Sequence, residues 1–203
     1  MVDNGNDFAG TPFLQSVRQE ARRTLGIRSG EFMFLFVGQH IWEKNLGFLL
    51  DSLVRLSDIP FRMYFVGSGY ASHELKQKVV ELGLASKVSF VGSIVEREIL
   101  KRYYVAADLF LFPSLYDNAP LVIREAACIG HSFGIDQGFY RFGNNLRFGK
   151  WFLSPNSTEA YSNRIREILC STAIIKQVGE EHHELLPGHG KTWPVKCTIV
   201  ITG

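Results

Sequence analysis

This sequence of 203 residues contains few cysteines, carries almost no net charge and has no long apolar run. The three cysteines, Cys128, Cys170 and Cys197, form no Cys-x-x-Cys pair, so we expect reduced thiols, no disulfides and no zinc site. No apolar run approaches the roughly 18 residues of a membrane span, and the N-terminal MVDNGNDFAG is no signal peptide. A net charge of +2 gives no general reason to expect nucleic acid or a membrane as partner. We therefore expect a cytoplasmic globular protein.

Motifs that would indicate a bound cofactor or metal are incomplete. The GKT at 190–192 imitates the end of a P-loop, but Leu185 stands where the first glycine is required. The GSG at 67–69 follows a predicted strand, yet Ser72 replaces the third glycine of the dinucleotide fingerprint, which favours a tight turn. Three histidines near the C-terminus lie in a segment without regular periodicity, and we interpret that segment as a tail rather than a metal site.

Apolar runs and amphipathic segments alternate along most of the chain. The apolar runs have the character of buried strands, at 32–38, 61–69, 87–94 and 109–113. Around them lie segments with helical spacing, at 15–26, 44–57, 71–84 and 96–108. This alternation predicts right-handed βαβ units and hence an α/β fold, a Rossmann-like parallel sheet flanked by helices.

The composition and the hydrophobic periodicity of the sequence change at both ends and after residue 130. Residues 1–15 are polar and Gly-rich and indicate a linker or a cut edge of a domain. Residues 131–152 alternate Gly and Phe with neither strand nor helix period, and helical spacing resumes from 153 to about 181. We predict one Rossmann-like domain over 16–181, irregular at 131–152, and a disordered or aberrant tail over 182–203.

Three turns follow predicted strands and carry candidate ligand-binding residues. In the first, Gly38 allows backbone amides to approach a phosphate, and Lys44 opens the next helix with a positive charge. The alternative is an ordinary loop with a solvated lysine. The second turn is the GSG at 67–69. Because the carboxyl ends of parallel strands meet at one edge of a sheet, these turns are expected to border a ligand crevice.

The third turn joins the strand LFLFP to a helix beginning at Ala119-Pro120. Proline is favoured in the first helical turn, and Asn or Asp just before it can cap the free amides. Asp117 and Glu125 flank this turn with seven residues between them. The alternative is a cap and a surface glutamate, but the position beside the other two turns favours a binding site for an anionic ligand.

Four segments carry a family resemblance: VGQHIWEKN, YFVGSG, KVSFVGS and, above all, AADLFLFPSLYDNAPLVIREAA. They resemble the C-terminal, donor-binding domain of group 1 retaining glycosyltransferases with the GT-B fold. The resemblance covers about residues 4–130 and 153–181. It implies that the chain binds a nucleotide-diphosphate sugar, with no metal or other cofactor, and that the glycosyl group passes to an acceptor hydroxyl.

The resemblance also implies roles for individual residues. Glu125 is expected to bind the ribose and Asp117 to lie near the donor sugar, although the family has Glu at the first of these two positions. Lys44 and Gln39 map onto the cations that bind the phosphates, and Gln39 donates a hydrogen bond without a charge. Asp117 and Lys44 are the residues implied in catalysis. The remaining expected contacts are mainly backbone amides, at Gly38, Gly67, Gly69, Asn118, Ala119, Pro120 and Leu121.

Two expectations limit what the chain does alone. The GT-B fold has two Rossmann-like domains with the reaction between them, and this chain is expected to begin at the linker, without the acceptor domain. The acceptor, whether glycan, lipid or small molecule, then belongs to the whole enzyme, and peripheral membrane contact stays open. The alternatives are a non-catalytic nucleotide-sugar-binding module or an inactive fragment. A third alternative is a GT-B-fold epimerase or phosphorylase. The sequence shows neither the further acid/base residues that an epimerase needs nor the pyridoxal-phosphate lysine that a phosphorylase needs.

Residues 131–152 and the tail also suggest an error of reading frame. Skipping one nucleotide from Gly130 to Trp151 permits, by choice of synonymous codons, GTPSVLTRGSTASEIISASENG, which is similar to the family. Skipping two after His183 permits the amphipathic RTTARTWEDLAREMYNRYN. The hypothesis is that the coding sequence carries frameshifts at about 129–152 and after about 183. Resequencing the DNA tests it, and an uninterrupted frame with a well-packed 131–152 would contradict it.

Overall fold

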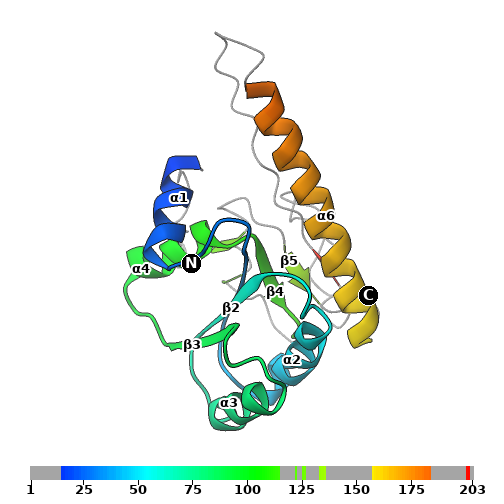
Figure 1. Ribbon diagram of the computed structural model, residues 1–203. Coiled ribbons are helices and arrows are strands. Elements are labelled where there is room, and N and C mark those ends of the chain that lie inside the picture. Colours follow the sequence, from blue (N-terminus) through cyan, green and yellow to red (C-terminus); the bar gives the residue numbers. More distant parts are fainter. Residues whose placement is uncertain are drawn as a thin grey trace, which may run out of the picture.

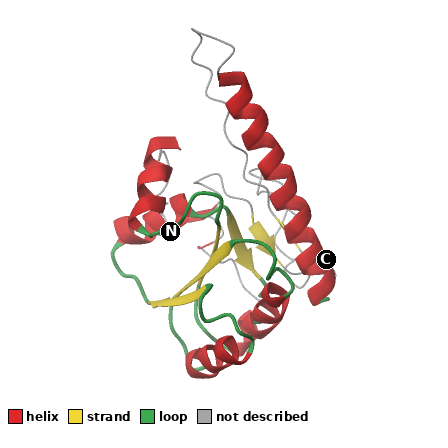
Figure 2. Ribbon diagram, in the orientation of Figure 1, coloured by secondary structure: helices red, strands yellow, loops and turns green. Residues whose placement is uncertain are grey.

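The computed structural model describes residues 15–114, 122, 125–126, 133–135, 157–183 and 200–201. Within these residues, six strands form one sheet in the order β3-β2-β1-β4-β5-β7, and every neighbouring pair is parallel (Figure 2). The strands are β1 (Phe32–Val37), β2 (Phe61–Val66), β3 (Val88–Gly92), β4 (Leu109–Phe112), β5 (Phe133–Ile135) and β7 (Val200–Ile201). The helices are α1 (Gln15–Thr24), the 3-10 turn η1 (Trp42–Lys44), α2 (Leu46–Val54), α3 (Ser72–Glu81), α4 (Arg97–Ala106) and α6 (Thr158–His183).

The helices cover the sheet in two groups (Figure 1). On one side α1 packs against α4, and on the other α2 packs against both α3 and α6. The hydroxyl of Ser162 in α6 donates to the carbonyl oxygen of Ser52 in α2 at 2.8 Å, and the rings of Phe48 and Tyr161 meet edge to face. Coverage on both sides explains why the central strands are apolar along their whole length rather than alternating.

Phenylalanine supplies much of the core. Residues Phe34, Phe36, Phe65, Phe110 and Phe112 are at most 1% exposed. Ring contacts run from Phe110 through Phe112, Phe36 and Phe65, with centroids 5.8 to 6.2 Å apart. Such offset ring pairs contribute beyond their buried area. The abundance of Phe in the sequence, 16 in all, is therefore explained in part by the centre of the sheet.

The predicted α/β class, a Rossmann-like parallel sheet flanked by helices, is confirmed. Every strand and helix predicted between residues 15 and 113 is present, with ends that differ by up to three residues. Two details differ from the expectation. Within 131–152, predicted to be irregular, Phe133–Ile135 forms β5 beside β4, and within the predicted tail Val200–Ile201 forms β7. Backbone pairing to a neighbouring strand leaves no side-chain period in so short a segment, which is why the sequence did not reveal it.

A buried charge cluster joins α1 to the starts of β1 and β4. Asp108, 7% exposed, accepts hydrogen bonds from Arg18 at 2.5 Å, from Arg22 at 2.7 Å and from the backbone amide of Met33 at 2.8 Å. Three donors satisfy the carboxylate, as a buried charge requires. This cluster fixes α1 across the end of the sheet opposite to the turns predicted to bind a ligand.

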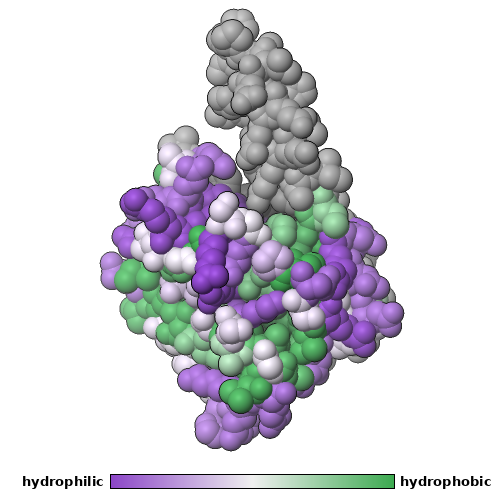
Figure 3. Space-filling view, viewed as in Figure 1, coloured by the Kyte–Doolittle hydropathy of each residue, from purple (hydrophilic) through white to green (hydrophobic). Residues whose placement is uncertain are grey.

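The described surface is mixed in character. In Figure 3, hydrophilic residues gather over α1 and around α3, and apolar patches lie between them. Among the helices that the structure describes, none is both long and apolar enough to cross a membrane.

Candidate functional site

The strand order places a reversal point beside β1. From β1 the chain moves outward to β2 and β3 on one side, and then returns to place β4 on the other side of β1. In open α/β sheets such a reversal opens a crevice at the carboxyl ends of the strands, where ligands bind.

The turns after β1 and β2 are in direct backbone contact. The amide of Gly38 donates to the carbonyl oxygen of Val66 at 3.0 Å, and the amide of His40 donates to that of Ser68 at 3.1 Å. A Cβ on Gly67 would lie 1.9 Å from the carbonyl oxygen of Gly38, and φ at Gly67 is +132°, a conformation that side chains rarely adopt. Glycine at position 67 is therefore required for the two turns to meet.

His40 ties these turns to the start of α3. It is 1% exposed, and its Nδ1 lies 3.1 Å from the hydroxyl oxygen of Ser72. Its carbonyl oxygen accepts the amide of Ala71 at 3.0 Å. Burial, helped by the positive charge of Lys76, lowers the pKa of His40 below its ordinary value of 6.5. The ring is thus neutral at pH 7 and acts as part of the scaffold beneath the turns.

Lys44 lies at the reversal point itself. Its Nζ is 5.5 Å from the centroid of the Phe112 ring, so a cation from the loop after β1 lies over the end of β4. Ser114, which follows β4 and is fully buried, donates to the carbonyl oxygen of Glu43 at 3.5 Å. Gln39 is exposed in the same turn as Gly38. The first turn therefore presents one cation and one amide side chain at the carboxyl edge of the sheet.

Glu125 is held against α4 by two side chains. Arg97 Nη2 donates to its Oε1 at 2.7 Å, and the hydroxyl of Tyr104 donates to its Oε2 at 3.0 Å. The Glu125 side chain is 12% exposed. Because Arg97 begins α4, just after the loop that follows β3, this carboxylate lies near the same edge of the sheet as the other predicted site residues.

Comparison with known proteins identifies the family. Residues 17–182, well over half of the chain, match the family described as "Glycosyl transferases group 1". The chain belongs to the group 1 glycosyltransferases.

Its relatives are longer proteins. This group 1 glycosyltransferase is 31% identical over 110 residues to the glycosyltransferase MJ1607 of Methanocaldococcus jannaschii, over 54% of the chain and 28% of that relative. It is similar in structure to HepE of Anabaena, solved with UDP and glucose, with a TM-score of 0.63, 20% identity and coverage of 80% of this chain and 44% of HepE. The C-terminal domain of the group 1 protein LpcC from Francisella tularensis gives a TM-score of 0.62 and 16% identity, over 75% of this chain and 82% of that domain. At these identities the two structures show a shared fold.

The predicted site residues of this group 1 glycosyltransferase divide into two sets. Gly38, Gln39, Lys44, Gly67 and Gly69 lie at the carboxyl ends of β1 and β2, and their turns are in contact. Glu125 lies beside α4. The predicted residues in the motif itself lie outside the described residues: Asp117, Asn118, Ala119, Pro120 and Leu121.

Sequence reasoning missed three residues that shape the site. Arg97 and Tyr104 were predicted only as parts of a helix, and His40 only as part of a turn. No local signal pairs Arg97 with Glu125, which is 28 residues further along the chain. The signal that could have pointed to His40 was its position three residues after the end of a buried strand, where a polar side chain that is also buried needs a specific partner.

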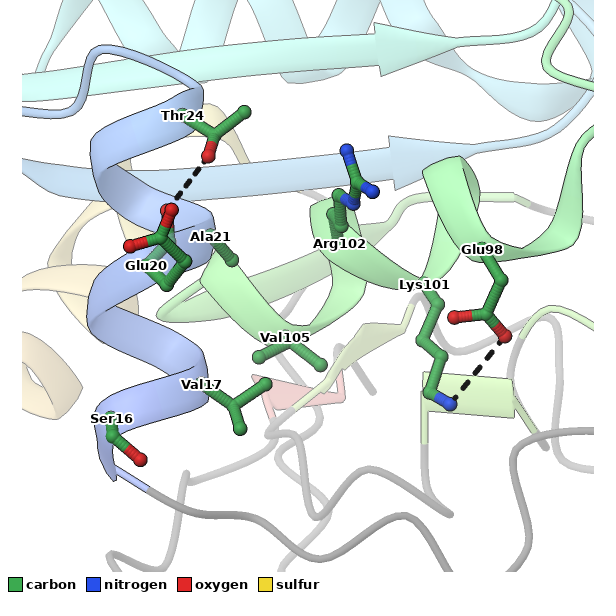
Figure 4. A pocket seen from close by; sticks show the side chains of 9 residues that line it. All are labelled: Ser16, Val17, Glu20, Ala21, Thr24, Glu98, Lys101, Arg102 and Val105. Atoms are coloured by element: carbon green, nitrogen blue, oxygen red, sulfur yellow. Dashed lines mark hydrogen bonds and ion pairs between the residues drawn. The ribbon is translucent and has the colours of Figure 1, made fainter.

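A separate groove of about 660 Å³ lies between α1 and α4 (Figure 4). None of its nine lining residues belongs to the predicted site. Glu20 and Glu98 among them are balanced by Lys101 and Arg102, so the groove offers no net attraction to an anionic ligand. The candidate ligand site is therefore the edge of the sheet formed by the strand ends, not this groove.

Among the described residues, no group of three or more His, Cys, Asp and Glu side chains could hold a metal ion.

Proposed function

We propose that this chain is the donor-binding half of a retaining glycosyltransferase and binds a nucleotide-diphosphate sugar at the carboxyl edge of its sheet. The observation that carries the proposal is Lys44, whose ammonium lies over Phe112 at the point where the strand order reverses. A cation and glycine-rich backbone turns at such a crevice suit a diphosphate. The solved HepE structure with UDP and glucose supports the choice of ligand.

In this proposal each part of the site binds a different part of the donor. The turns at Gly38 and at 67–69 and the side chains of Gln39 and Lys44 hold the diphosphate. Glu125 accepts hydrogen bonds from the ribose, and Asp117 lies near the sugar. The backbone amides of Asn118, Ala119 and Leu121 complete the contacts with the phosphates and the sugar, and Pro120, which has no amide hydrogen, shapes the turn. No metal or further cofactor is part of the proposal.

The reaction breaks the bond between the anomeric carbon of the sugar and the terminal phosphate oxygen of the donor. The nucleoside diphosphate leaves with the bonding electron pair, and the acceptor hydroxyl oxygen bonds to the anomeric carbon while its proton passes to the leaving phosphate oxygen. Lys44 and the backbone amides stabilise the negative charge that develops on the leaving phosphate. This is electrostatic stabilisation by groups already in position, so it costs little reorganisation.

The acceptor is proposed to bind to a part of the enzyme other than the described domain. The chain covers 28% of the length of its methanogen relative, and it is similar to LpcC over a solved C-terminal domain. Without groups that orient an acceptor hydroxyl, the rate advantage of proximity is lost. The second candidate function follows from the same coverage: a cytoplasmic module that binds a nucleotide sugar and transfers nothing by itself.

A two-stage experiment tests the proposal. Saturation-transfer NMR with UDP-glucose, UDP-N-acetylglucosamine and GDP-mannose measures donor binding by the chain, and ATP serves as a control nucleotide. We expect binding of one of the three diphosphate sugars in preference to ATP. Turnover is then measured with and without a supplied N-terminal half, and turnover only with that half supports the donor-half assignment. Absence of binding by all three donors would overturn the proposal.

A further inference from the structure

The carboxylate of Glu125 is oriented by two donors before any ligand is present. Arg97 Nη2 contacts Oε1 at 2.7 Å and the Tyr104 hydroxyl contacts Oε2 at 3.0 Å, so each oxygen has a different partner. A carboxylate with both oxygens engaged cannot rotate freely about its last bond. Since an ionised carboxylate has about four acceptor positions, roughly two remain for further donors. A ribose offers two, the hydroxyls at its 2′ and 3′ carbons.

Tyr104 is the rigid member of this arrangement. It is 0% exposed, and its ring stacks on that of Phe110 with centroids 5.7 Å apart. Burial, and then the nearby negative charge of Glu125, raise the pKa of Tyr104 well above its ordinary value. The hydroxyl therefore stays protonated and remains a donor. Its oxygen also lies 3.4 Å from the carbonyl oxygen of Val122, at the side of the same short segment.

Arg97 is the charged member, and its position is not explained by its own helix. It is the first residue of α4, where the helix dipole disfavours a positive charge. Its side chain is 42% exposed, whereas that of Glu125 is 12% exposed. Arg97 therefore reaches from the more exposed side of the pair and holds the more buried carboxylate by a charge-assisted hydrogen bond.

We propose that Arg97 is a positioning residue for ribose recognition, which holds the Glu125 carboxylate turned so that its remaining acceptor positions face the two hydroxyls of the donor ribose. The inference rests on the proposed function, because it requires that a nucleotide binds at this edge. It assigns to Arg97 no direct contact with the donor. Its effect is exerted through Glu125, so loss of Arg97 weakens recognition of the ribose hydroxyls specifically.

The experiment compares two probes that differ only at the ribose. Uridine 5′-diphosphate and 2′,3′-dideoxyuridine 5′-diphosphate are titrated calorimetrically into the full chain, and the guanosine pair is used if uridine diphosphate does not bind. We expect the wild-type chain to prefer the ribose form by about tenfold or more, as for hydrogen bonds to a charged group. In Arg97→Ala we expect affinity for the ribose form to fall about tenfold, with the dideoxy form changed less than about twofold.

Two further variants separate positioning from folding. Arg97→Lys keeps a charged donor and is expected to restore part of the preference for ribose. Arg102→Ala removes an exposed arginine from the same helix and should leave both affinities unchanged. Thermal unfolding of each variant checks that the fold is intact. If Arg97→Ala proves unstable, the test rests on Arg97→Lys. Its ratio of affinities for the ribose and dideoxy probes is expected to be lower than that of the wild type but still greater than one.

The outcomes distinguish the inference from the proposed function. Binding by the wild type with the same ribose preference in Arg97→Ala, or in Arg97→Lys if only that variant folds, overturns the role of Arg97 and leaves the donor site standing. An equal loss of affinity for both probes also overturns it, because that pattern indicates general damage to the site. Absence of binding of both nucleoside diphosphates by the wild type overturns the proposed function and the inference together.

Discussion

A Cβ added to Gly69 would lie 2.3 Å from the carbonyl oxygen of His40, so the turns after β1 and β2 touch backbone to backbone. This contact leaves no room for a side chain at position 69. It holds together two of the three turns that the proposed donor site requires.

Alanine substitutions at two glycines are expected to have opposite effects on stability. Gly69→Ala forces apart Gly69 and the backbone of His40, and we expect a loss of about 1–3 kcal/mol in the free energy of unfolding. Gly47→Ala is the matched control, because its Cβ would meet only ordinary contacts at 3.7 and 3.9 Å in α2. There we expect a gain of up to about 1 kcal/mol from reduced chain entropy. Urea unfolding measures both free energies. A loss for Gly47→Ala equal to that for Gly69→Ala would contradict the view that the close contact with the His40 backbone requires glycine at position 69.

Glu125→Ala is expected to reduce nucleotide binding far more than Asp117→Ala, because a ribose contact serves every donor. Calorimetric titration with the nucleoside diphosphate that binds the wild type measures the difference. Removing the carboxylate also takes away the nearer acceptor of the Tyr104 hydroxyl, at 3.0 Å, at a cost of about 1 kcal/mol in stability. Glu125→Gln keeps an acceptor for that hydroxyl and is the control for folding. Equal binding by the wild type and Glu125→Ala would refute the assignment.

Lys44→Met is expected to weaken binding of a nucleoside diphosphate by about tenfold, since one charge-assisted contact with phosphate is lost. Affinity for the corresponding nucleoside, which carries no phosphate, should not change. Lys101→Met makes the same change of charge on α4 and should leave both affinities as they are. Titrations at two salt concentrations check the electrostatic origin, because the difference between wild type and Lys44→Met shrinks as salt screens the charge. An equal loss for the nucleoside would indicate structural damage instead.

The lowered pKa of His40 leads us to expect that the stability of the fold depends on pH. Its pKa is lowered in the folded chain, so below an unfolded value of about 6.5 the unfolded chain binds more protons than the folded chain. The contribution of neutral, buried His40 is complete above that value and is lost as the pH falls from there towards the lowered pKa. We expect His40→Leu to lose stability less steeply than the wild type between pH 7 and pH 5. Urea unfolding across that range measures both slopes, and parallel curves would contradict the prediction.

Much of the fold was readable from sequence because its signals are local. The run FMFLFV at 32–37 is apolar throughout, and a strand of that kind is stable only between two layers. In α2, Leu46, Leu49, Leu50 and Leu53 repeat at helical spacing, and all four are fully buried. The glycines at 38, 67 and 69 could also be placed at strand ends, because a turn is expected where an apolar run stops.

The partners within the site could not be read in the same way. Lys44 was expected near a phosphate, but only the order of strands in the sheet places it over Phe112. Burial of His40 depends on β2 and α3 closing over it. The pairing of Glu125 with Arg97 depends on a segment returning to α4 after β4. Sequence spacing carries no information about which helix a chain meets after a crossover.

The sequence by itself determined the elements, their alternation and hence the parallel α/β class, because periodicity and turn chemistry act over a few neighbouring residues. It also predicted, through the turn glycines and Lys44, at which edge of the sheet an anionic ligand is expected to bind. Only the tertiary structure decided which side chains meet there and at the opposite end, where Arg18 bonds to Asp108, 90 residues away. Such pairs form because right-handed crossovers bring distant segments together and burial then requires each charge to find a partner.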